Sequence, residues 1–109
     1  KNAEKTEESQ KLDKSVIFFA QLGEQARQKA LRMVEDLRRA GIKMHHNLGK
    51  SSLKAQLEQA NKLRAAYALI LGQKEVQDGT IIIRDMESGI QEIVDQKKMK
   101  AAIEKKMEA

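Results

Sequence analysis

The chain has 109 residues, enough for one domain that buries a core without disulfides or structural metals. It contains no cysteine, which excludes disulfides, thiolate zinc sites and a cysteine nucleophile, and no apolar run approaches the ~20 residues that cross a bilayer. The formal net charge of +5 suits either a polyanionic partner or an ordinary basic domain. Aromatic residues make up only 3%, so we do not expect a stacking platform of several aromatic side chains.

Residues 1–14 are charged and nearly free of large apolar side chains. Such a composition predicts a flexible linker or tail, with the folded domain at residues 15–109. The chain opens with charged and polar residues and shows no signal-peptide pattern. It begins with Lys1 and not with methionine, so we expect a fragment or a processed product.

The first half of the domain alternates between strands and helices. Residues 15–20 form a continuous apolar run, typical of a strand covered on both faces. Residues 24–40 carry apolar side chains at helical spacing, and Gly41 ends that helix. Residues 42–48 are half apolar and predict a strand at the edge of the sheet.

The second half begins with a helix whose buried stripe starts at Leu53 and whose N-cap we expect to be Ser51. Three further strands are predicted, at residues 67–71, 80–85 and 90–94. A closing helix is predicted over residues 95–107. Residues 72–79 read as a short charged connector that forms a tight loop, and residues 86–89 have the composition of a turn.

The order of these elements predicts an α/β fold. Strands one to three alternate with helices and should be parallel, whereas the connector at 72–79 is too short for a parallel crossover. We therefore expect a three-layer α/β/α sandwich with three helices and a mixed sheet of about five strands, in the order 2-1-3-4-5 with strand four antiparallel. Ligands of such sheets bind beyond the carboxyl ends of the strands, here at the loops 20–23, 47–51 and 72–79.

The sequence offers no catalytic set and no metal site. His45 and His46 are adjacent on a predicted strand and point to opposite faces, so they cannot easily share one ion. The segment around Lys50 lacks the glycine spacing of a nucleotide-binding loop. Lys50 could still meet a nucleic-acid phosphate, or it could be a solvated loop lysine.

Basic side chains gather on the second helix and its flanks, where Glu58 is the only acid: Lys50, Lys54, Lys62 and Arg64. Such residues would attract an RNA backbone without reading its sequence, or they would simply form a solvated face. Reading bases needs other groups: a carboxylate such as Glu75 can accept from a guanine, and Arg84 can donate to acceptor edges. We expect these two side chains to lie near each other on one solvent-open ledge. Alternatively, Glu75 is a surface acid and Arg84 is a solvated strand residue.

Several runs resemble the C-terminal anticodon-binding domain of histidine–tRNA ligases, over residues 16–94. They are LGKSSLKAQ at 48–56, LGQKEVQDGT at 71–80 and RDMESGIQE at 84–92. Related domains occur in threonine, proline and glycine tRNA ligases. The resemblance implies recognition of a tRNA anticodon loop, with tRNA-His and its GUG anticodon as the expected partner.

The resemblance also implies roles for individual residues. Glu75, Arg84 and Gln56 would contact RNA bases, and Lys50 lies in the loop that approaches the same nucleotides. Arg84 is a departure, because lysine is common at this position in histidine enzymes.

A parent enzyme follows from the same resemblance. Its catalytic domain, which uses ATP and Mg, is absent from this chain, so we expect no catalytic residue and no cofactor in this segment. The parent is expected to be a cytoplasmic homodimer that does not bind membranes, and the isolated domain a monomer. The alternative is a non-catalytic regulatory or protein-interaction module that kept the fold.

Overall fold

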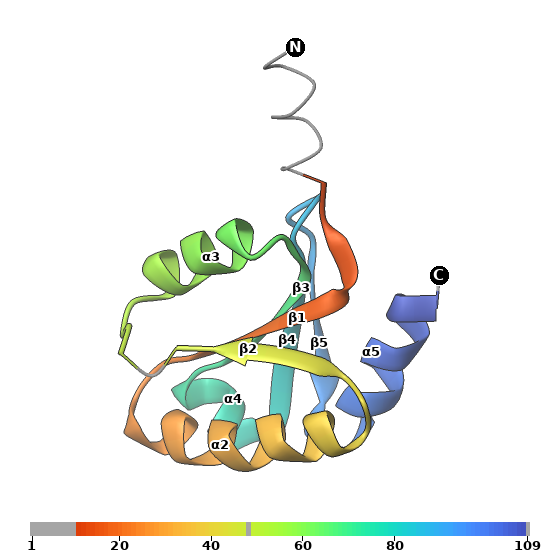
Figure 1. Ribbon diagram of the computed structural model, residues 1–109. Helices are drawn as coiled ribbons and strands as arrows, with labels where there is room; N and C mark the ends of the chain where they lie inside the picture. Colours follow the sequence, from red (N-terminus) through yellow and green to blue (C-terminus); the bar gives the residue numbers. More distant parts are fainter. Residues whose placement is uncertain (1–10, 48, 109) are drawn as a thin grey trace.

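The computed structural model describes residues 11–47 and 49–108, and it contains one mixed sheet (Figure 1). The strand order is β2-β1-β3-β4-β5, as predicted. β1 pairs in parallel with β2 and β3, whereas β4 is antiparallel to both β3 and β5. The strands are β1 (Asp13–Gln21), β2 (Lys43–His46), β3 (Ala65–Leu71), β4 (Thr80–Asp85) and β5 (Gln91–Asp95).

Helices cover both faces of this sheet and confirm the three-layer arrangement. α2 (Glu24–Arg39) and α5 (Met99–Glu108) pack on one face, and α3 (Leu53–Lys62) packs on the other (Figure 1). The alternation of β1 separates the two cores: Phe19 packs among the residues under α2, and Phe18 among those under α3. Both phenylalanines are fully buried, which explains the continuous apolar run at residues 16–20 of β1.

β1 begins earlier than the apolar run suggests. Asp13 is already a strand residue, because it pairs with Ala65 and its N–H donates to the carbonyl of Arg64 at 2.8 Å. Two residues of the segment expected to be a linker therefore belong to the sheet. Lys11 and Leu12 have no regular secondary structure, and residues 1–10 lie outside the described part of the chain.

The number of helices differs from the prediction. Residues 11–47 and 49–108 contain four α-helices, because the connector expected to be a tight loop holds α4 (Gln73–Asp78). Its sequence shows no period since six residues make less than two turns. Gly79, with φ 74°, ends α4 in the left-handed conformation that favours glycine.

Several other boundaries were shifted; β3, for example, begins at Ala65 and not at residue 67. The closing helix is divided into a 3-10 turn, η1 (Gln96–Lys98), and α5. The N-cap of α3 is Ser52 rather than Ser51, because the Ser52 hydroxyl accepts from the N–H of Ala55 at 3.1 Å. Within the described ranges, no helix has the length and apolar character needed to cross a membrane.

Candidate nucleic-acid interface

A buried glutamine fastens the start of α3 to the end of β1. The Gln56 amide nitrogen donates to the carbonyl of Gln21, and the N–H of Gln21 donates to the Gln56 amide oxygen, both at 2.9 Å. Gln56 has no exposed surface. This burial contradicts the expectation that Gln56 contacts an RNA base, because its polar groups are turned inward and already satisfied. Its role here is to position α3.

The loop between β2 and α3 is held by a second set of polar contacts. The Asn47 side chain donates to Gln59 of α3 at 3.0 Å and accepts from the N–H of Gly49 at 2.8 Å. Gln21 also donates to the carbonyl of Asn47 at 3.4 Å. The loop thus presents the exposed side chain of Lys50 beside the start of α3.

The remaining cations follow α3 across the sheet. Lys54 and Lys62 are exposed on the helix, and Arg64 is exposed just after it in a left-handed conformation with φ 60°. Because Gln56 ties the start of α3 to the end of β1, and Arg64 accepts from Asp13 at the other end of β1, the helix spans the sheet. Its ten residues are about 15 Å long. The four cations predicted to contact the RNA backbone therefore lie along α3, with Lys50 before its start and Arg64 just after its end.

Glu75 lies in the first turn of α4 and not in a loop. One carboxylate oxygen, Oε1, accepts from the N–H of Gly72 at 2.9 Å and so caps the helix. A side chain at position 72 would place its Cβ only 2.8 Å from that oxygen and would push the carboxylate out of its capping position. The second oxygen receives no hydrogen bond from any residue of the described ranges. Glu75 is half-buried and keeps an acceptor for a ligand.

Arg84 is held at the hairpin of β4 and β5. Its Nη1 donates to Gln91, its cross-strand neighbour, at 3.0 Å. Its Nε is buried and lacks a partner among the described residues. A Cβ at Gly89 would lie 3.5 Å from Nη2, so the turn passes close to the guanidinium. The sequence did not reveal the role of Gln91, although the predicted hairpin register would have placed it opposite Arg84.

The structure does not bring Glu75 and Arg84 together. The Gln96 side chain donates to the carbonyls of Glu75 and Thr80, at 3.3 and 3.0 Å, so Glu75 lies near the first residue of β4. Arg84 is four residues further along that strand, a displacement of roughly 13 Å. The two residues therefore lie toward different ends of β4, contrary to the expectation that they share one ledge.

An open apolar surface lies beside Arg84 on the face that α3 covers only in part. Ile82 packs against the core under α3, and Arg84 shares its face because the two residues are two positions apart. Ile93 is opposite Ile82 on β5 and is 68% exposed. Branched apolar side chains can support the flat face of an unstacked base. Sequence reasoning missed this surface, since its exposure depends on how far α3 extends over the sheet.

The histidines of β2 are each half-buried. Burial, and secondarily the positive charge of Arg38, lowers the pKa of His46 below its ordinary value. Its Nδ1 is buried and has no partner within the described ranges. Those ranges also contain no group of three histidine, cysteine, aspartate or glutamate side chains that could hold a metal ion.

These features define a basic helix that lies across a mixed sheet, with Glu75 near one end of β4 and Arg84 near the other. The chain belongs to the anticodon binding domain family, which matches residues 14–106. Within this family it is similar to histidine–tRNA ligases. It is 39% identical to the histidine–tRNA ligase of Staphylococcus carnosus, and the match covers 76% of this chain and 19% of that protein. It is 41% identical to the histidine–tRNA ligase of Dehalococcoides mccartyi, and the match covers 65% of this chain and 17% of that protein. The chain thus spans about a fifth of these curated relatives.

Solved structures agree with this assignment. Apo histidyl-tRNA synthetase from S. aureus superposes with a TM-score of 0.75 and 26% identity, over 86% of this chain and 27% of that one. The RNA binding domain of threonyl-tRNA synthetase from Cryptosporidium parvum superposes with a TM-score of 0.72. The match covers 83% of this chain and 22% of that one. Its identity of 16% supports the fold alone.

Proposed function

We propose that this chain recognises the anticodon loop of tRNA-His as the anticodon-binding domain of a histidine–tRNA ligase. One observation of the structure supports this most strongly: α3 carries its cations from one end of β1 to the other, alongside an open sheet face that bears Arg84. A single-stranded loop needs such a charged track for its phosphates and an adjacent surface for its bases. The names of the similar proteins, which are histidine–tRNA ligases, support the choice of tRNA.

The phosphates would lie along Lys50, Lys54, Lys62 and Arg64. These contacts are exposed and contribute salt-sensitive affinity without base preference.

Bases would be read at the two ends of β4. The carboxylate of Glu75 has a free oxygen that suits the N–H groups of a guanine, and GUG has a guanine at each end. Arg84 keeps donors beyond its bond to Gln91, and these suit the acceptor edge of another base. Because Glu75 lies near the first residue of β4 and Arg84 is four residues further along that strand, they would contact different nucleotides.

The remainder of the enzyme belongs to the same proposal. A separate catalytic domain would bind ATP and Mg and activate histidine, and the parent would be a homodimer. That domain would bind the acceptor end of the same tRNA. Because the two domains are linked, their contacts together would give a higher affinity for the tRNA than the anticodon-binding domain alone.

Fluorescence anisotropy with a labelled anticodon stem-loop tests the proposal directly. Glu75→Gln keeps an oxygen that can accept from Gly72 and so preserves the cap, but it removes the charged acceptor. We expect weaker binding of a GUG stem-loop by about 1–3 kcal/mol, the value of one hydrogen bond to a charged group. We expect a much smaller loss on a stem-loop of equal length with an unrelated anticodon.

Glu108→Gln provides the matched control, because it makes the same charge change at an exposed position at the end of α5. It should leave both affinities unchanged. Equal losses on both stem-loops, or wild-type binding that does not prefer GUG, would contradict anticodon reading. That outcome would support the regulatory or protein-interaction alternative instead.

A further inference from the structure

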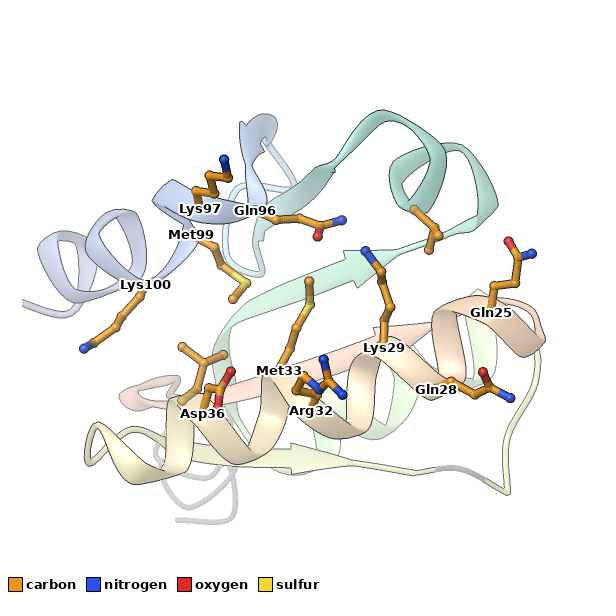
Figure 2. Close-up of a pocket in the computed structure, with 12 residues that line it drawn as sticks. Gln25, Gln28, Lys29, Arg32, Met33, Asp36, Gln96, Lys97, Met99 and Lys100 are labelled. Carbon is orange, nitrogen blue, oxygen red and sulfur yellow. The ribbon is translucent and has the colours of Figure 1, made fainter.

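A groove on the opposite face of the molecule is separate from the cations of α3. It has a volume of about 880 Å³ and lies between α2 on one wall and η1 with the start of α5 on the other (Figure 2). α2 and α3 cover opposite faces of the sheet (Figure 1). A tRNA loop bound along α3 therefore leaves the walls formed by α2 and α5 free, whereas Val76 and Gln96 line the part of the groove nearest Glu75.

The walls of the groove are positively charged. Lys29 and Arg32 come from α2, Lys97 from η1 and Lys100 from α5, while Asp36 is the only carboxylate of the lining. Within residues 11–47 and 49–108, none of the four cations forms an ion pair. Cations brought together without counter-ions repel one another, so an acidic ligand would be attracted electrostatically.

The floor of the groove is apolar. Met33 of α2 and Met99 of α5 point toward each other across it, and Lys29 extends from α2 toward the opposite wall (Figure 2). Met99 is buried and Met33 is half-buried against the same core. Methionine side chains are flexible and adapt to apolar ligand groups, as they do in grooves that bind amphipathic helices.

We propose that this groove binds an acidic amphipathic segment of another polypeptide. Its apolar side chains would lie on Met33 and Met99, and its carboxylates would pair with the cations of both walls. The apolar floor favours a peptide over a nucleic acid, because a phosphate backbone has no groups that gain from apolar contact. The cations make the surface selective for acidic segments, since a basic one would be repelled.

The test uses the whole 109-residue chain, isotopically labelled for NMR. The probe is a synthetic helical peptide of about 14 residues, or four turns, with leucines along one face and glutamates along the other. We expect it to shift the amide signals of α2, η1 and α5 and to leave those of α3 unchanged. The same peptide with glutamine in place of every glutamate should bind at least tenfold more weakly, because it lacks the charges that meet four cations.

Two double variants locate the binding. Arg32→Glu with Lys100→Glu reverses one charge on each wall and should raise the Kd of the acidic peptide about tenfold. Lys54→Glu with Lys62→Glu makes the same charge change on α3 and should leave that Kd unchanged while it weakens stem-loop binding. Circular dichroism checks that each variant is folded.

Three results would overturn the proposal. The first is no binding of the acidic peptide. The second is an equal loss in both double variants, which would indicate general charge attraction. The third is a stem-loop that shifts the groove residues of α2 and α5 and displaces the peptide, which would make the groove a nucleic-acid site. The first two results leave the proposed binding of an anticodon loop along α3 unaffected and only the third bears on it, so the two proposals can fail separately.

Discussion

Replacing Gln56 with leucine removes the side chain that fastens α3 to β1. The volume changes little, but the N–H and the carbonyl of Gln21 both lose their partner. Gln21 is itself buried, with 4% of its surface exposed, so water cannot easily replace the lost bonds. Each unpaired buried group costs roughly 1–3 kcal/mol, which gives about 2–6 kcal/mol for the pair. That is a large part of the 5–15 kcal/mol by which a typical domain is stable.

Urea denaturation followed by circular dichroism measures this effect. The unfolding midpoint should fall in Gln56→Leu with the slope unchanged, because the surface exposed on unfolding is the same. Gln59→Leu is the matched control on the same helix. Gln59 is half-buried and has one side-chain bond, to Asn47, so we expect a cost of only about 0.5–1.5 kcal/mol. A Gln56→Leu variant that loses less than about 1 kcal/mol would refute the assigned role of this glutamine.

Three other predictions concern RNA affinity, pH and backbone conformation. Lys54→Ala should weaken binding of every stem-loop and reduce the slope of log K against log salt by about 0.7–0.9, the value of one phosphate contact; an unchanged slope would mean that Lys54 does not contact the RNA. The pKa of His46 is lower in the folded chain than the ordinary 6.5, so the unfolded chain binds more protons. The stability that His46 contributes should therefore be fully present above about pH 6.5 and decrease as the pH falls below it, whereas His46→Gln should show a flatter profile in urea melts between pH 5 and 8. A steeper profile in the variant would contradict this sign. Gly79→Ala should cost about 1 kcal/mol because φ is 74° there, and Gln77→Ala, at an exposed position of the same helix, should be nearly neutral in the same melts.

The topology could be predicted because connector lengths restrict it. Two helical crossovers required parallel strands, and the short connector at 72–79 required β4 to run the other way. α4 could not be predicted from periodicity, since its six residues show no stripe. Its signals were local: Gly72, then Glu75 three residues later, and Gly79 at the end.

The candidate site was predicted less completely. The cations of α3 follow from the helix itself, and the structure places them on its exposed surface. The burial of Gln56 depends on which side of α3 meets β1, and no local pattern reveals that a polar residue will face the sheet. The separation of Glu75 and Arg84 could have been inferred from the length of β4, but the expected loop at 72–79 left the direction of Glu75 undetermined.

The proposed function depends most on one RNA loop lying along α3 and reaching both ends of β4. An NMR titration of the labelled chain with a GUG stem-loop measures it most directly. We predict shifts at Lys54 and Lys62 on α3, at Glu75 and at Arg84, with α2 unaffected. Shifts confined to α2, η1 and α5, or shifts at only one end of β4, would contradict the proposed path of the RNA.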